Sequence, residues 1–129
     1  MLELSLTMTS LMTSDMANAA GFVHGGRLMH LLDNVAYACA SRYSRKNVVT
    51  AQVNSLSFDA PLLVGDLVTV HAEIEKTGRA SMIVSFRVEA ENIRTGVRRS
   101  TSGGYFKMVA VDDEGRSTPV PQLAVAGAH

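Results

Sequence analysis

The sequence is poor in the features that mark secreted, membrane-spanning and nucleic-acid-binding proteins. It contains one cysteine, Cys39, which excludes an intrachain disulfide and fits a reducing cytoplasm. Twelve basic and twelve acidic side chains cancel, which disfavours nucleic acid and charged membrane surfaces as partners. No apolar run approaches membrane-spanning length, and the N-terminus lacks the basic and then apolar order of a signal peptide. We therefore expect a cytoplasmic protein that does not bind membranes.

Hydrophobic residues, in contrast, make up 47% of the 129 residues, and charged residues make up 19%. A chain of this length and composition is long enough to bury a core, and it is small enough to gain stability from oligomerisation. The composition predicts one domain over residues 1–129. The segment with Pro119 and Pro121 is expected to be extended, and the last residues are expected to form a loose tail.

One stretch has helical periodicity over about twenty residues. Residues 25–44 contain no proline and no glycine after Gly26, and their apolar side chains recur at helical spacing. We predict one long helix with a buried stripe made of Leu28, Leu31, Leu32, Val35, Cys39 and Tyr43. Asp33 falls just off that stripe, beside Met29 and Ala36, and so out of open solvent. A carboxylate in such a place is costly unless it is used or paired.

Alternation of apolar and polar residues predicts five strands around this helix, and Asn47 is a candidate helix stop. The strands are expected at residues 2–9, 48–58, 67–76, 82–89 and 97–111. Gly103 and Gly104 interrupt the last strand, which indicates a bulge or the close approach of another backbone. Five strands form a sheet roughly 24 Å wide, whereas a helix is only about 10 Å across. The sheet must therefore curl around the helix, which gives an α+β fold.

The start of the helix suits the binding of an oxygen anion. Its first amides lack intrahelical partners and carry the positive end of the helix dipole, and Gly25 and Gly26 would let a ligand approach them closely. The same glycine pair could instead relieve crowding where the helix enters the sheet. Gly26 and Asp33 are separated by two turns, roughly 10 Å. Either an ester or thioester with its attacking water fills part of that gap, or the acid acts on a ligand held by a neighbouring subunit.

Several short motifs occur in a fixed order along the chain. They are Asn18-x-x-Gly21-x-x-His24-Gly25-Gly26 with Asp33 seven residues later, Val48-Val49-Thr50-Ala51, Phe58-Asp59-Ala60-Pro61, Val64-Gly65-Asp66, Thr77-Gly78-Arg79-Ala80-Ser81 and Val109-Ala110-Val111-Asp112. In order and spacing these motifs resemble those of the hotdog-fold acyl-CoA thioesterases, over about residues 14 to 121. The resemblance implies a hotdog fold, an antiparallel five-stranded sheet wrapped around one long central helix. It also implies hydrolysis of acyl-CoA without a cofactor, by a homodimer that can assemble into a tetramer or hexamer.

The resemblance also implies roles for individual residues. Asp33 would be the catalytic carboxylate, either the base that activates water or the nucleophile that forms a mixed anhydride. Asn18, which alone would be read as a turn residue, would orient the water or the thioester. The amide of Gly26, next to Gly25, would bind the oxyanion. We expect Asn18 of one subunit to act with Asp33 of its partner.

Other residues are expected to bind substrate. His24 is expected to line the acyl pocket, although it could also cap the helix or act as an acid. The match at Gly78, Arg79 and Ser81 makes this turn a candidate contact for CoA, whereas an arginine in a turn is ordinarily a surface residue. The four histidines lack the spacing of a metal set, so no metal is expected.

Two rival functions fit the same fold. One is an acyl-CoA-binding or sensing module without catalysis, since a fold does not determine a function. The other is a hydratase or dehydratase that uses His24 with Asp33. The surrounding motifs resemble those of thioesterases more closely.

Overall fold

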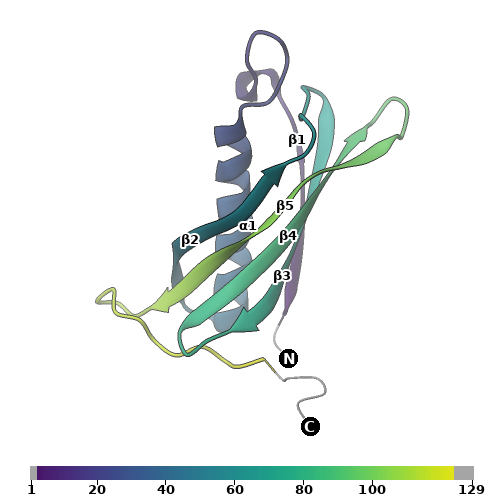
Figure 1. Ribbon diagram of the computed structural model, residues 1–129. Coiled ribbons are helices and arrows are strands. Elements are labelled where there is room, and N and C mark those ends of the chain that lie inside the picture. Colours follow the sequence, from purple (N-terminus) through teal and green to yellow (C-terminus); the bar gives the residue numbers. More distant parts are fainter. Residues whose placement is uncertain (1–2, 124–129) are drawn as a thin grey trace.

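A single long helix lies along one face of a curved antiparallel sheet (Figure 1). The computed structural model describes residues 3–123. The elements in order are β1 (Ser5–Leu11), a short 3-10 helix η1 (Ser14–Met16), α1 (Gly25–Ser44), β2 (Asn47–Phe58), β3 (Asp66–Thr77), β4 (Ser81–Asn92) and β5 (Arg98–Val111). The sheet order is β1-β3-β4-β5-β2, and α1 contacts every strand. The predicted α+β hotdog architecture is confirmed. The expected loose last residues lie outside the described part, and the expectation of one domain stays a prediction.

Helix α1 is held by the apolar stripe that the sequence predicts. Leu28, Leu32, Val35, Cys39 and Tyr43 are buried, and Leu31 is half-buried at the margin. They pack on the inward side chains of the sheet, which include Val70, Val84, Phe106 and Met108. This burial is the main favourable term for α1, because each large apolar side chain removed from water contributes about 1.5–3 kcal/mol.

The end of α1 differs from the expectation. The candidate stop at Asn47 is wrong, because Arg45 already leaves the helix in the left-handed region, with φ at 60°. The amide of Arg45 donates to Ser41 O at 2.7 Å and satisfies one of the last helical carbonyls. Asn47 is instead the first residue of β2.

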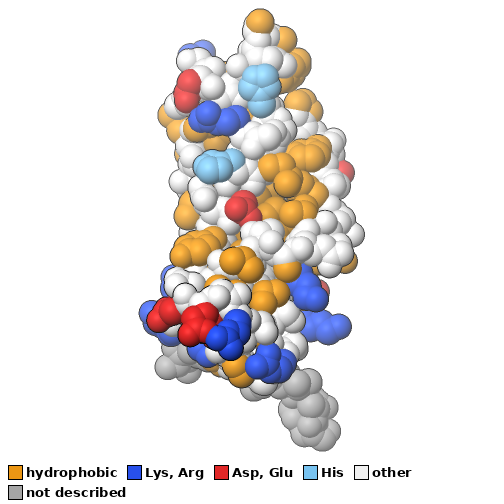
Figure 2. Space-filling view, turned by 90° about the vertical axis from the view of Figure 1, so that its left-hand side faces the viewer, with side chains coloured by type: hydrophobic (Ala, Val, Ile, Leu, Met, Phe, Trp, Pro, Cys, Tyr) orange, Lys and Arg blue, Asp and Glu red, His pale blue; other side chains and the backbone are white. Residues whose placement is uncertain are grey.

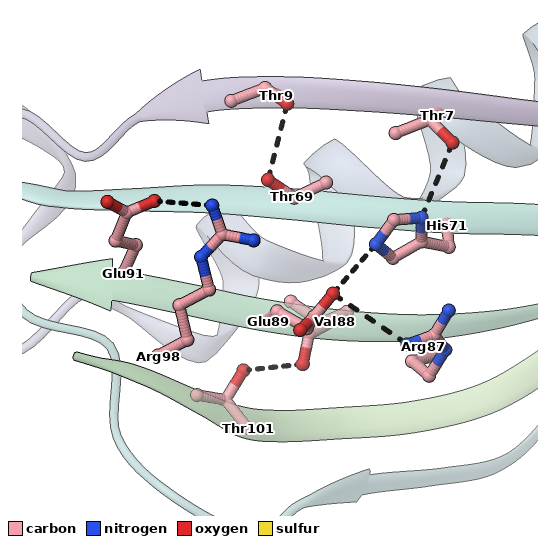
Figure 3. Close-up of polar contacts among 10 residues, drawn as sticks. All are labelled: Thr7, Thr9, Thr69, His71, Arg87, Val88, Glu89, Glu91, Arg98 and Thr101. Carbon is pink, nitrogen blue, oxygen red and sulfur yellow. Dashed lines mark hydrogen bonds and ion pairs between the residues drawn. The ribbon is translucent and has the colours of Figure 1, made fainter. Parts of the chain in front are cut away.

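The outer face of the sheet is polar, as expected for an antiparallel sheet covered on one side only. In β3 and β4, inward residues such as Val70 and Val88 pair in register and are fully buried. On the outer face His71 Nε2 lies 2.8 Å from Glu89 Oε1 (Figure 3). An ion pair between Arg98 and Glu91, at 3.4 Å, continues this polar surface. This face therefore does not contribute to the apolar core.

The predicted irregularity at Gly103 and Gly104 is a close approach of another backbone. β2 shifts register between Asn54 and Ser57, with Ser55 at φ 49°, opposite Gly104 at φ 156°. A Cβ on Gly104 would lie 3.0 Å from both Leu56 Cα and Ser55 O, so that the backbone of β2 would have to shift by a few tenths of an ångström. The glycine is therefore required by the bulge in β2.

This geometry predicts that Gly104→Ala lowers the free energy of unfolding by about 1–3 kcal/mol, because both the backbone angle and the contact are unfavourable for a side chain. Urea unfolding followed by circular dichroism measures the change. Gly103→Ala is the matched control, since a Cβ there would meet only Phe86 O at 3.6 Å. Equal destabilisation by the two substitutions would contradict the assignment.

The segment after β5 passes the C-terminal end of α1 and is held there by hydrogen bonds. Tyr43 Oη donates to Pro121 O at 2.6 Å, and the amide of Val120 donates to Arg79 O at 2.9 Å. Val120 is buried in the core. The predicted extended segment around Pro119 and Pro121 is thus part of the packed structure as far as it is described. Among residues 3–123, no helix is both long and apolar enough to cross a membrane.

Candidate functional site

The loop before α1 is organised by the side chain of Asn18. Its Oδ1 accepts hydrogen bonds from the amides of Ala20, at 3.0 Å, and Phe22, at 3.1 Å. Gly21, at φ 86°, allows the chain to reverse between them. The turn role that a lone asparagine would have is therefore present. Because Oδ1 is occupied, the exposed Nδ2 is the group that remains for a ligand, and it can only donate.

The first turn of α1 presents free amide groups to open space. His24 is the N-cap residue of the helix, as considered for it, although its side chain makes no capping hydrogen bond. The carbonyl of His24 accepts hydrogen bonds from the amides of Arg27 and Leu28. The amides of Gly25 and Gly26, in contrast, have no acceptor among the described residues. A Cβ on either glycine would meet nothing within 4 Å. Crowding within this chain therefore does not account for the glycine pair, and both glycines are exposed.

Asp33 projects from α1 two turns further on and is contacted by β2. Thr50 Oγ1 donates to Asp33 Oδ1 at 2.5 Å. The expectation that Asp33 is kept out of solvent is wrong for the single chain, where the residue is exposed. The reason is that the sheet covers one side of α1 and stops at β2, which leaves this flank of the helix uncovered.

Thr50 is the residue that the sequence analysis missed at this site. It lies in the motif Val48-Val49-Thr50-Ala51, which by itself indicates no role for the threonine. The available signal was the strand periodicity, because Thr50 shares a face with Val48, which is buried against α1. A hydroxyl on that face has to point towards the helix.

Two other aspartates of the motifs, Asp66 and Asp112, have structural roles. Asp66 is buried, bonded by Arg99 Nη2 at 2.6 Å and by the amide of Leu63 at 2.8 Å. Asp112 accepts from two backbone amides of its own turn. Asp33 accepts only from Thr50 among the described residues, although a carboxylate can accept about four hydrogen bonds. It therefore has unused capacity to bind water or substrate.

The surface around Asp33 is apolar, although it is exposed in the single chain. Tyr37 of α1, one turn beyond Asp33, is 47% exposed, and Val53 of β2, which pairs with the buried Phe106 on the sheet face towards α1, is 42% exposed. Figure 2 shows hydrophobic side chains gathered on this side of the molecule. β2 is also an edge strand that pairs only with β5. An uncovered apolar face beside an unpaired strand edge is typical of a protein interface.

The turn between β3 and β4 is far from the Asn18 loop in one chain. Gly78, Arg79 and Ser81 lie near the C-terminal end of α1, whereas Asn18, His24 and the two glycines surround its N-terminal end (Figure 1). Arg79 is exposed, and its Nη1 donates to Ser117 Oγ at 3.3 Å. Gly78 and Ser81 line an open pocket of about 860 Å³ together with Lys76 and Lys107. Two lysines give this pocket cationic groups that could contact an anionic ligand.

The chemistry available at the site is that of a carboxylate and hydrogen-bond donors. Burial raises the pKa of Cys39 to about 11, so the one cysteine is protonated near neutral pH and is no nucleophile. Within residues 3–123, no group of three His, Cys, Asp or Glu side chains could hold a metal ion. Asp33 can accept a proton or attack a carbonyl carbon. The amides of Gly25 and Gly26 can stabilise negative charge on an oxygen.

Comparison with known proteins places the chain among thioesterases. The family model described as the thioesterase superfamily matches residues 20–97. The chain is 41% identical to protein VdlD of Helicobacter pylori over 117 residues, which are 91% of this chain and 67% of that protein. Among solved structures it is similar to an apo hexameric acyl-CoA thioesterase. The TM-score is 0.89 at 34% identity, over 93% of this chain and 77% of that chain.

A second group of solved structures comes from the acyl-CoA hydrolase of Staphylococcus aureus. One of them contains butyryl coenzyme A, coenzyme A and coenzyme A disulfide, and it matches with a TM-score of 0.87 at 26% identity, over 93% of this chain and 73% of that chain. Three others are alanine mutants of that enzyme, in which an asparagine, an aspartate or a threonine is replaced.

Proposed function

The chain belongs to the thioesterase superfamily, and on this premise we propose that it hydrolyses acyl-CoA thioesters. Water adds to the thioester carbonyl carbon, the carbon to sulfur bond breaks, and the products are a carboxylic acid and the free thiol of CoA. CoA is part of the substrate, and the proposed reaction needs no cofactor or metal. We also propose a cytoplasmic location.

The observation that carries the proposal is that the same helix holds two amides without an acceptor among the described residues and a carboxylate that accepts a single hydrogen bond from those residues. Among the described residues the amides of Gly25 and Gly26 have no acceptor, and both glycines are exposed. Asp33 is held by Thr50 and retains capacity for a ligand. The intervals between the asparagine, aspartate and threonine replaced in the Staphylococcus aureus enzyme equal those between Asn18, Asp33 and Thr50. This agreement supports a role for all three residues.

Each group then has a defined task in the proposed reaction. Asp33 activates the attacking water or attacks the carbonyl carbon itself. The amide of Gly26 donates to the carbonyl oxygen as negative charge develops on it. Asn18 donates from Nδ2 to the carbonyl or to the water, because its Oδ1 is held by the loop. Thr50 is a positioning residue that fixes the rotamer of Asp33 through its hydroxyl. His24, before these amides, would line the acyl pocket.

The proposed site is shared between two copies of the chain. Gly26 and Asp33 lie on the same helix, and two turns of roughly 10 Å separate them, so one chain cannot bring both to a single small atom. The apolar flank with Tyr37 and Val53 is exposed, and a second copy would cover it. Pairing across the free edge of β2 would turn the Asn18 loop of one subunit towards Asp33 of its partner. A hexameric acyl-CoA thioesterase among the similar structures supports assembly beyond a dimer.

The turn with Gly78, Arg79 and Ser81 is proposed to bind the CoA portion of a substrate. We predict that Arg79→Ala raises KM for acyl-CoA more than it lowers kcat, because a phosphate contact far from the carbonyl contributes mainly uniform binding. Steady-state kinetics with several acyl-CoAs measure both constants. Arg94→Ala, at an exposed arginine in the β4 to β5 turn, is the matched control. An unchanged KM in Arg79→Ala would leave Arg79 as a surface residue.

The proposed function is tested by the release of free thiol from a panel of acyl-CoAs that differ in chain length. We expect CoA release that depends on enzyme concentration with at least some members of the panel. Binding of acyl-CoA without any thiol release would favour the non-catalytic module.

A further inference from the structure

A small apolar cavity lies between the first turns of α1 and the segment that contains η1. Its volume is about 100 Å³, and its apolar wall is formed by Met12, Met16, Leu28 and Leu31. Met12 and Leu28 are buried in the core, whereas Met16 and Leu31 are half-buried. One side of the wall is thus fixed by core packing. The other side, with Met16, has room to adjust.

The cavity is accessible from the surface. Arg27 and His30, which complete part of its lining, are both exposed. Arg27 is also held at the surface by an ion pair with Asp15, with Nη2 and Oδ2 3.3 Å apart. A ligand can therefore enter on this side without unfolding of the core.

The cavity begins within one helical turn of the free amides. Leu28, in the wall, follows Gly26 by two residues along α1. The carbonyl of Met16 accepts a hydrogen bond from the amide of His24 at 2.9 Å, so the second side of the wall is tied to the same helix start. A ligand held at the first amides of α1 would therefore lie close to this cavity.

We propose, as a refinement that rests on the proposed thioesterase function, that this cavity binds the acyl chain and that Met16 limits its length. A volume of about 100 Å³ equals roughly three water molecules at about 30 Å³ each, which suits the first few carbon atoms of an aliphatic chain. The methionine side chain is flexible and adapts to different shapes. The site therefore favours short acyl groups and tolerates variation among them.

The proposal predicts that Met16→Ala changes the chain-length preference. The ratio of kcat/KM for octanoyl-CoA to that for butyryl-CoA should rise about tenfold or more, since each methylene accommodated in an apolar pocket contributes about that factor. Met8→Ala is the matched control, because Met8 is a half-buried methionine on β1 that packs on the core and does not line the cavity. No change of the ratio in Met16→Ala, or an equal change in Met8→Ala, would overturn the proposal.

A second measurement does not depend on catalysis. In protein labelled with ¹³C at the methionine methyl groups, S-hexyl-CoA should shift the signals of Met12 and Met16 relative to CoA alone, and should leave Met8 unshifted. If both compounds bind but these signals are the same with each, the acyl subsite fails while the proposed function stands. If calorimetry detects binding of neither compound, binding of CoA itself fails, and the proposed function and the subsite fall together.

Discussion

Replacing Asp33 by asparagine is expected to lower kcat for acyl-CoA hydrolysis by about two orders of magnitude or more, with the fold unchanged. The amide has the shape of the carboxylate, and its oxygen can still accept from Thr50 Oγ1, so the packing of α1 on β2 is kept. It can neither take a proton from water nor attack a carbonyl carbon, and removal of a positioned base typically costs a factor of 10² to 10⁴.

The measurement is steady-state thiol release, with circular dichroism and thermal unfolding to establish that the variant is folded. Asp113→Asn is the control, since Asp113 is an exposed aspartate in the turn after β5. Turnover close to that of the wild type in folded Asp33→Asn would remove Asp33 from the mechanism.

Mixing two inactive variants is expected to restore activity. Asn18→Ala and Asp33→Ala are each expected to be inactive, because each breaks every site in its homodimer. If Asn18 of one subunit acts with Asp33 of its partner, a mixed dimer contains one site with both residues intact and one site with neither. Refolding the two together in equal amounts should then give roughly a quarter of the wild-type activity, since half of randomly formed dimers are mixed.

The same experiment has a sharp negative outcome. If the two residues act within one chain, every site in the mixture lacks one of them and no activity returns. Mass spectrometry establishes that mixed dimers have formed. Inactive mixed dimers would remove the shared site while leaving the role of Asp33 untouched.

The sequence predicts the main elements because their periodicities are long and uninterrupted. The apolar stripe from Leu28 to Tyr43 is the buried face of α1, and the alternation in β3 and β4 gives their inward and outward sides. The role of Gly104 is predictable as well, because a glycine inside a strand often marks a bulge or the close approach of another backbone. Such features depend on local residues alone.

Features that depend on distant residues were not predictable in the same way. The bond from Thr50 to Asp33 joins residues 17 positions apart and requires the register of β2 against β5 and its position beside α1. The hydrogen bond from Tyr43 to Pro121 joins residues 78 positions apart, and no periodicity in the sequence indicates it. Arg45 was not predicted as the residue that ends α1, because an arginine rarely takes a left-handed conformation.

The exposure of Asp33 has a different origin. Its place beside the apolar stripe correctly indicates an apolar neighbour, the exposed Tyr37 one turn further along α1. The helical wheel cannot tell whether those neighbours are covered by the same chain or by another copy. In one chain the surface is open, so its burial depends on assembly.

The products formed from crotonyl-CoA test the central claim most directly. Mass spectrometry of the reaction separates the three functions that fit this fold, because each gives a different product. A thioesterase releases free CoA and crotonic acid, and this is the result we predict for the wild type, with loss of both products in Asp33→Asn. A gain of one water with the thioester intact would identify a hydratase instead. Unchanged crotonyl-CoA, together with unchanged saturated acyl-CoAs, would contradict catalysis altogether.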